Sequence, residues 1–262
     1  MRLSTVALVA IFAVGSPVHA QDKSTVDALI KKLNDKDPDN RLKAVEALGA
    51  IGADAKPAAY TLCVLANSDA SEEVRRAATG AFGKVHPDLA PLVSTLVTKT
   101  EPAALTAAAD KIGKMGPDGV AATPALIRCI DRLDRKQECD SPVVGACFRA
   151  IGEIRPADEG VTNQIGQAAR LNRNAENREA GVRCLGKIGV AHADRRKDVL
   201  PYLKFSIIDT TPEVRVAALE AAASLGPDAK DLNLVIQLAA EDENAAVRKA
   251  AAAALEAIEK KK

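Results

Sequence analysis

The chain has 262 residues, of which 47% are hydrophobic, 27% are charged and 2% are aromatic, with no Trp. Its 36 basic and 35 acidic residues nearly cancel. This balance disfavours a nucleic-acid-binding protein, which usually needs a basic surface and stacking aromatic rings. The hydrophobic content is ample for a folded core. Because much of it is alanine, it favours closely packed helices over sheets.

Residues 1–20 have the pattern of a secretory signal peptide. A positive N-terminus precedes an almost unbroken apolar run at 3–15, and small residues surround the expected cleavage site at 18–20. We therefore expect an exported protein, periplasmic or secreted, whose mature chain begins at Gln21. A buried N-terminal helix is the alternative interpretation. No later stretch reaches the roughly 20 apolar residues of a spanning helix, so no membrane span is predicted.

Residues 21–262 repeat one pattern at intervals of 30 to 39 residues. The pattern is anchored on a glycine or the residue in its register, namely Gly49, Gly83, Gly113, Gly152, Gly186, Ala223 and Glu256. A small residue stands five positions before each anchor, and the residue directly before it is usually bulky and apolar. Such a stripe marks one face of a helix that a neighbouring helix approaches closely. The period predicts a solenoid of about seven units.

A second apolar segment precedes each of these helices, so each unit is predicted to be a helical hairpin. Proline is tolerated in the first turn of a helix and poorly in its interior. The prolines at the expected start of the second helix are Pro38, Pro102, Pro142 and Pro212. Those at the expected start of the next first helix are Pro57, Pro91, Pro124 and Pro201. Because one hairpin cannot bury its apolar face alone, each unit uses the next as its core.

An Asp and an Arg six residues apart recur at the turn inside several units. The pairs are Asp35 and Arg41, Asp69 and Arg75, Asp209 and Arg215, and Asp242 and Arg248. Unit five offers Asn172 before Arg178. Together with the small-residue columns, this pattern resembles HEAT repeats over about residues 24–260, especially the bacterial HEAT-like type also found in phycobilin lyases.

The resemblance implies an all-α superhelical solenoid of about seven two-helix repeats. It also implies that each Asp closes the turn inside its unit, while each Arg reaches the Asp of a neighbouring unit. Units three and four depart from the pattern, with Lys99 and Leu105, and Glu138 and Val144, in those places. We therefore expect an interrupted ladder and a changed stacking angle in the middle of the chain.

No motif in the sequence indicates catalysis. The four aspartates share one repeat position, which favours a structural role over a glycosidase-type acid and base. His86 and His192 lie in turns between units, without neighbours at the spacing of zinc ligands. The glycines occur where helices end and not in phosphate-binding patterns. We predict no enzyme, no cofactor and no metal site.

The five cysteines are Cys63, Cys129, Cys139, Cys147 and Cys184. Cys129 and Cys147 lie nine residues either side of the turn in unit four, where antiparallel helices would bring them level. They are the best candidates for a disulfide, because an exported protein meets an oxidising compartment. The interpretation we favour is that Cys147 and Cys184 fill columns held elsewhere by Ala and Gly, since side-chain directions must also match in a disulfide.

Basic side chains recur at solvent-facing positions of the second helices in the middle units. They are Lys84, Lys114, Arg149, Arg183 and Lys187. The resemblance to HEAT solenoids places second helices on the concave face, where these side chains would form a mildly basic strip. An ordinary charged helix face is the alternative. We expect a non-catalytic scaffold that binds a protein or cell-envelope component there, with acidic partners as candidates. The similarity to phycobilin lyases suggests an accessory or lyase-type protein as the other hypothesis.

Overall fold

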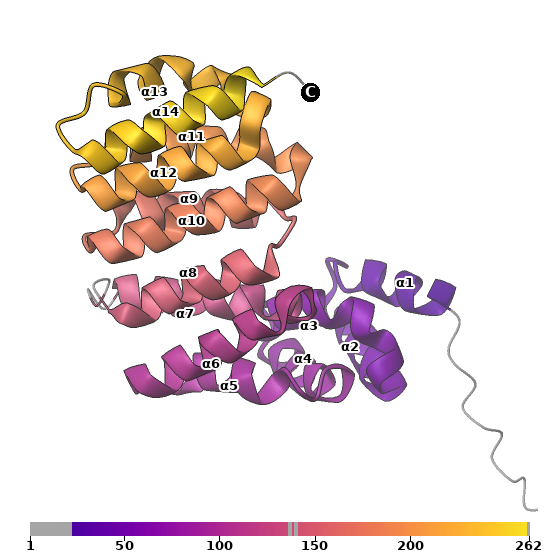
Figure 1. The fold of residues 1–262 in the computed structure, drawn as a ribbon. Coiled ribbons are helices and arrows are strands. Elements are labelled where there is room, and N and C mark those ends of the chain that lie inside the picture. Colours follow the sequence, from indigo (N-terminus) through magenta and orange to yellow (C-terminus); the bar gives the residue numbers. More distant parts are fainter. Residues whose placement is uncertain (1–22, 136–137, 139–140, 261–262) are drawn as a thin grey trace, which may run out of the picture.

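The computed structural model describes residues 23–135, 138 and 141–260. The predicted signal peptide at 1–20 and Cys139 lie outside these residues. Within them the chain forms fourteen α-helices, four short 3-10 helices and no strand. The all-α prediction and the count of seven hairpins are confirmed (Figure 1). None of the helices in this part of the chain is long and apolar enough to cross a membrane.

Each hairpin consists of an odd-numbered first helix and an even-numbered second helix. The first four hairpins are α1 (Lys23–Lys32) and α2 (Pro38–Ile51), α3 (Ala59–Ser68) and α4 (Glu72–Val85), α5 (Ala90–Thr98) and α6 (Pro102–Lys114), and α7 (Thr123–Arg135) and α8 (Pro142–Ile154). The last three are α9 (Glu159–Leu171) and α10 (Ala175–Ala191), α11 (Arg196–Ile207) and α12 (Pro212–Leu225), and α13 (Asn233–Ala239) and α14 (Ala245–Glu259).

Proline positions explain six of the fourteen helix starts among the described residues. The second helices α2, α6, α8 and α12 each begin at the predicted proline. Pro91 and Pro124 are the second residues of α5 and α7, where a missing amide hydrogen costs no helical bond. The prediction for Pro201 is wrong, because α11 begins five residues earlier and holds this proline in its interior. One intrahelical hydrogen bond is lost there.

Short 3-10 helices connect several units. They are η1 (Gly52–Ala58), η2 (Gly116–Ala122), η3 (Ala193–Arg195) and η4 (Gly226–Leu232). Three of them begin at a glycine with positive φ, of 71° at Gly52, 57° at Gly116 and 58° at Gly226. Residues with a Cβ rarely adopt this conformation, so glycine is the residue that lets the chain leave the second helix here.

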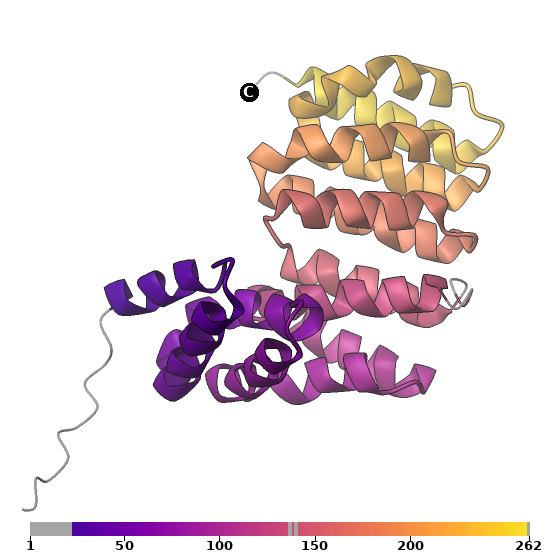
Figure 2. The same cartoon turned by 180° about the vertical axis from the view of Figure 1, so that it is seen from behind.

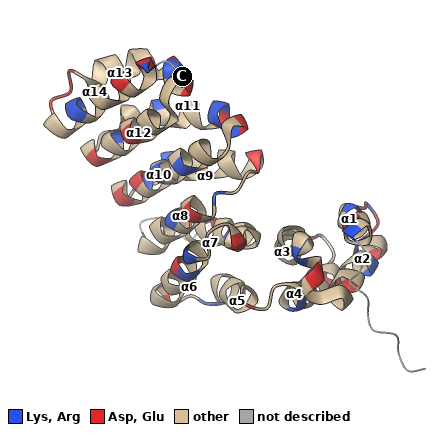
Figure 3. Cartoon of the chain, turned by 45° about the vertical axis from the view of Figure 1, so that its right-hand side comes forward, with Lys and Arg blue, Asp and Glu red and all other residues tan. Residues whose placement is uncertain are grey.

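The hairpins form two arms that meet at a break. In the longer arm, α6, α8, α10, α12 and α14 pack against one another in chain order, with their first helices behind them (Figures 1 and 2). In the shorter arm, α2 packs on α4. Helix α4 makes at most a marginal contact with α6, and α3 packs instead against α7. The shorter arm therefore turns away from the longer stack (Figure 3).

The anchor glycines show where the stack is closed. A Cβ on Gly152 would lie 3.1 Å from Cys184 Cα, and one on Gly186 would lie 2.7 Å from Ala221 Cβ. A Cβ on Gly83, the anchor of α4, would have no neighbour within 4 Å. Glycine thus permits close helix packing along the longer arm, and the same column faces open space at the break.

Candidate functional site

Arginines and aspartates tie neighbouring hairpins together at three boundaries. Arg41 Nε lies 2.7 Å from Asp69 Oδ2, and Arg178 Nε lies 2.8 Å from Asp209 Oδ2. At the last boundary, Arg215 Nη2 lies 2.8 Å from Asp242 Oδ1. These contacts occur between units one and two and along units five to seven. They are absent from the described residues at the three boundaries between units two and five, where the sequence lacks one or both partners.

The same residues close the turn inside their own unit. Asp69 Oδ1 accepts a hydrogen bond from the Ser71 amide at 2.8 Å, and Asp242 Oδ1 accepts one from the Asn244 amide at the same distance. Arg75 Nη1 donates to the Asp69 and Ala70 carbonyls at 2.6 and 3.0 Å. The six-residue spacing therefore lets the arginine side chain reach the carbonyl groups of the turn in its own unit.

The charges of this ladder are structural. The hydrogen bond from Arg41 holds the pKa of Asp69 below its usual range, and the bond from Arg215 does the same for Asp242. Burial works to raise the pKa of Asp209, but bonds from Arg178 and from the Thr211 amide lower it further than burial raises it. Carboxylates stabilised in this way are poor general acids at neutral pH.

The predicted basic residues divide into two groups. Lys114 on α6, Arg149 on α8, and Arg183 and Lys187 on α10 lie on consecutive stacked helices and are exposed. Lys84 is also exposed, but it lies on α4, across the break from α6. The structure therefore brings four of the five predicted residues onto one face and leaves Lys84 on the other arm.

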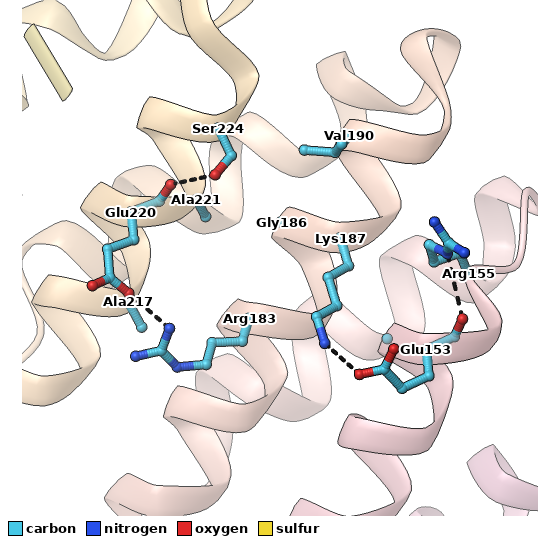
Figure 4. A pocket seen from close by; sticks show the side chains of 11 residues that line it. Glu153, Arg155, Arg183, Gly186, Lys187, Val190, Ala217, Glu220, Ala221 and Ser224 are labelled. Carbon is cyan, nitrogen blue, oxygen red and sulfur yellow. Dashed lines mark hydrogen bonds and ion pairs between the residues drawn. The ribbon is translucent and has the colours of Figure 1, made fainter. Parts of the chain in front are cut away.

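Two adjoining hollows of about 390 and 490 Å³ run along this face over α8, α10 and α12. They share Gly152, Glu153, Arg183 and Lys187, and we call them together the second-helix groove. Its floor toward α12 is made of small residues, Gly186, Ala217 and Ala221 (Figure 4). The small-residue columns of the repeat thus let the helices approach and also leave a channel between longer side chains.

Ion pairs cross the groove from helix to helix. Lys187 Nζ lies 2.6 Å from Glu153 Oε1, and Arg183 Nη1 lies 2.7 Å from Glu220 Oε2 (Figure 4). Arg183 Nε also contacts Glu179 at 2.9 Å. Blue ribbon segments, which mark Lys and Arg, and red ones, which mark Asp and Glu, both occur along these helices (Figure 3). At α10, the surface that was expected to be basic therefore carries basic side chains paired with glutamates.

These pairs hold the groove weakly. The Arg183, Lys187, Glu153 and Glu220 side chains are each about half exposed. An ion pair this exposed typically contributes about 0–1 kcal/mol, so a partner can replace one of its members. Arg149 and Lys114 have no ion pair within the described part of the chain, and they extend the basic character toward α6.

The cysteine pair of unit four is brought together. Cys129 on α7 and Cys147 on α8 are buried thiols, and each shifts the pKa of the other. The Cys147 thiol and the Arg132 guanidinium, whose Nη2 lies 3.8 Å from Cys129 Sγ, lower the pKa of Cys129 to about 7, against the effect of burial. Burial raises the pKa of Cys184 and of Cys63. The disulfide stays a prediction, because both residues are thiols in the structure.

His86 and His192 join units through their rings. His86 Nε2 lies 3.3 Å from the Asp118 carbonyl, and His192 Nε2 lies 2.8 Å from the Arg155 carbonyl. Each follows the last residue of a second helix. No group of three or more His, Cys, Asp or Glu side chains suited to a metal ion occurs among the described residues.

The first helices of the last three units carry an apolar row that was not predicted from the sequence. Among the described residues, five of the six exposed large hydrophobic side chains lie on α9, α11 and α13 or directly after them: Leu171, Phe205, Ile208, Leu234 and Leu238. The Arg170 guanidinium lies 4.1 Å from the centre of the Phe205 ring. Comparing registers could have found the row, because unit one has Lys31 and Asn34 where units six and seven have Phe205, Leu238 and Ile208.

Stacked helical hairpins tied by an arginine and aspartate ladder define an α-solenoid repeat protein. The HEAT-repeat prediction is confirmed for the N-terminal part of the chain, where a family model described as HEAT repeats matches residues 4–83. No curated protein matches the chain.

Several solved structures are similar to the chain. An engineered protein is 21% identical, with a TM-score of 0.49 over 90% of this chain and 68% of that chain. A computationally designed armadillo repeat protein for modular peptide recognition is 17% identical, with a TM-score of 0.42 over 88% and 99% of the two chains. The CpcE and CpcF complex of phycocyanin lyase from Nostoc sp. PCC7120 is 17% identical, with a TM-score of 0.39 over 97% and 92%.

Proposed function

We propose that this protein is an exported, non-catalytic scaffold that binds an acidic segment of a protein or cell-envelope component in the second-helix groove. The proposal rests on the basic side chains beside the small-residue floor, whose ion pairs are exposed and can be replaced by acidic groups of a partner. Arg183 and Lys187 are held only by exposed ion pairs, and Arg149 is exposed without one in the described part of the chain. Acidic side chains of a partner can replace Glu220 and Glu153 at these cations at little cost.

Extended polypeptide fits this surface better than a small substrate does. The two hollows adjoin along three successive helices, and stacking places their charged side chains at repeating intervals. A solenoid offers such a repeating surface without any change of fold. Charged side chains at its rim favour fast association and selection of the partner more than high affinity.

Site-directed photo-crosslinking in the native host tests the binding surface. A photoreactive residue replaces Arg149 in the groove, Leu171 in the apolar row, or Lys99 in the turn after α5 as a control. We expect a defined crosslinked product from position 149 and none from position 99. A product only from position 171 would assign binding to the first helices, and no product from any position would contradict a scaffold role.

Export has a separate test. Protein isolated from its native host is sequenced from its N-terminus, and its compartment is determined by cell fractionation. We expect a chain that begins at Gln21 and lies outside the cytoplasm, because the pattern at 1–20 is that of a cleaved signal peptide. A cytoplasmic chain that retains Met1 would refute export but would not contradict binding in the second-helix groove.

A further inference from the structure

A hollow of about 420 Å³ lies between α3, α4 and α5, at the break between the two arms. Its walls are mainly apolar and include Phe82 of α4 and Val93 and Val97 of α5. None of the thirteen residues around it is charged, although 27% of the residues in the chain are. An uncharged lining of this extent distinguishes the hollow from the second-helix groove.

The hollow exists because the stack is open there. Gly83, the anchor glycine of α4, lies in its wall. At the anchors Gly113, Gly152 and Gly186, an atom of the next second helix lies within 3.1 Å of the place that a Cβ would occupy, whereas at Gly83 no neighbour lies within 4 Å of it. Helix α6 does not cover α4, so the space that it would fill in a regular solenoid is left between α4 and α5.

Three polar side chains of the wall donate hydrogen bonds within their own helices. Asn67 Nδ2 donates to the Cys63 carbonyl at 2.8 Å, and Thr79 Oγ1 donates to the Arg75 carbonyl at 2.9 Å. Thr98 Oγ1 donates to the Ser94 carbonyl at 2.8 Å. Burial raises the pKa of the Cys63 thiol to about 12, so it is neutral at physiological pH. These side chains offer few free donors to hold water or an anion.

We propose that this hollow binds a small, uncharged, apolar molecule. Ligand pockets typically measure about 300–1,000 Å³ and are lined mainly by apolar side chains, and the hollow fits both criteria. Apolar cavities with few polar partners for water accept apolar guests. The absence of charge from the lining selects against ionised ligands, since a buried charge without a partner is costly. The site is distinct from the proposed macromolecular function and does not depend on it.

Two fluorescent probes with one aromatic skeleton test the proposal. N-phenyl-1-naphthylamine is neutral, and 8-anilinonaphthalene-1-sulfonate carries a sulfonate on a similar frame. Titrating each into the purified protein should show saturable fluorescence with the neutral probe. Binding of the sulfonate should be roughly tenfold weaker or more, because its charge would be buried unpaired. Equal affinity for the two probes would overturn the proposal.

Two glycines of α4 supply matched variants. Gly83 lines the hollow, while Gly80 lies one turn away outside it, and neither has a neighbour within 4 Å of a Cβ position. Both Gly83→Leu and Gly80→Leu should fold, since leucine favours a helix over glycine. Gly83→Leu should lower the affinity for the neutral probe roughly tenfold or more, because the leucine side chain occupies the hollow. Gly80→Leu should bind the probe with the affinity of the parent.

A second wall gives an independent check. Ser94→Phe on α5 fills the same hollow from the other side, so it should also weaken the neutral probe. The neutral probe should raise the melting temperature of the parent and of Gly80→Leu, because a ligand that binds only the folded state stabilises it. Unchanged probe affinity in both filled variants would place the probe elsewhere and refute the site.

Discussion

Arg41 of the first hairpin holds Asp69 of the second through two parallel hydrogen bonds, with Nε 2.7 Å from Oδ2 and Nη2 2.8 Å from Oδ1. Both side chains are largely buried, with 12% and 3% of their surface exposed. Asp69 Oδ1 also accepts the Ser71 amide. One carboxylate therefore closes its own turn and fastens two hairpins together.

Removing this carboxylate should destabilise the protein more than removing its counterpart in unit one. Asp69→Ala leaves Arg41 largely buried without its partner, which should lower the free energy of unfolding by about 3 kcal/mol. Asp35→Ala should cost clearly less, because Asp35 accepts the Asp37 amide but receives no arginine from a preceding unit among the described residues. Urea unfolding of both variants checks this, and equal losses would show that the link between hairpins adds nothing.

The ladder should also make stability fall in acid. The pKa values of Asp69, Asp209 and Asp242 are lowered in the folded chain. Their contribution is complete above the unfolded pKa, near 4, and is lost as pH falls through the lower folded values. We expect the urea concentration at the unfolding midpoint to decrease once the pH falls below about 4. The stability difference between the parent and Asp69→Asn should shrink in the same pH range. A deficit that stays constant from about pH 7 to about pH 2 would contradict the assignment.

The repeat and a change of stacking in the middle of the chain could be predicted from sequence, but the boundary between units two and three, where the break lies, could not. Column spacing and prolines identify the hairpins because both depend on contacts within one unit. The break depends on α3 packing against α7, a choice between two tertiary partners. Linker length does not reveal it, since α4 and α5 are joined by four residues, as are α8 and α9, where the second helices stack without interruption.

The basic strip was predicted only in part, for a similar reason. Solvent-facing positions follow from helical periodicity, so Arg183 and Lys187 were placed on the correct side of α10. Their partners Glu153 and Glu220 come from the neighbouring helices α8 and α12. The offset between helices decides which charges meet, and one sequence read unit by unit does not contain that offset.

The anchor glycines offer a direct test of the break. Gly186→Ala should destabilise, because its Cβ would lie 2.7 Å from Ala221 Cβ and 3.4 Å from Ala221 Cα. Overpacking of this kind commonly costs about 1–3 kcal/mol. Gly83→Ala should instead be neutral or stabilise by up to about 1 kcal/mol, since its Cβ meets nothing and alanine favours the helix. Thermal melts compare the two, and similar losses would mean that α4 is covered as regularly as α10.

Cys129 and Cys147 should form a disulfide under oxidising conditions. Oxidised glutathione is the electron acceptor: the Cys129 thiolate attacks one of its sulfurs and releases the first reduced glutathione. Cys147 then attacks Cys129 Sγ of the mixed disulfide, which forms the protein disulfide and releases the second reduced glutathione. The rate should rise as pH passes about 7, the lowered pKa of Cys129. Intact mass in a Cys139→Ser background should fall by two hydrogen atoms.

Cys63 and Cys184 serve as internal controls for that reaction. Both are buried, and burial raises their pKa values, so they should remain thiols under the same treatment. Peptide mapping locates the modified residues. Glutathione retained on Cys129, or oxidation of Cys63 in preference to the pair, would show that the two thiols do not reach bonding geometry.

Charge reversal in the groove should separate folding from binding. Arg149→Glu should change the free energy of unfolding by no more than about 0.5 kcal/mol, because Arg149 is exposed and has no ion pair in the described part of the chain. Arg183→Glu should cost about 1 kcal/mol, since it loses two ion pairs and sets a third carboxylate beside Glu179 and Glu220. Reversal at Arg183 therefore affects both properties, and Arg149 is the cleaner probe.

Titration with a fluorescent poly-glutamate peptide measures binding of an acidic partner, with poly-lysine as the matched control. The parent should prefer poly-glutamate, and Arg149→Glu together with Lys114→Glu should slow its association because both changes invert the rim charge on α8 and α6. The effect should fade as salt approaches about 1 M, where screening acts within about 3 Å. Lys84→Glu, on the other arm, should leave association unchanged. If Lys84→Glu slows association as much as the double variant does, attraction is a property of total charge, and the groove has no selective role.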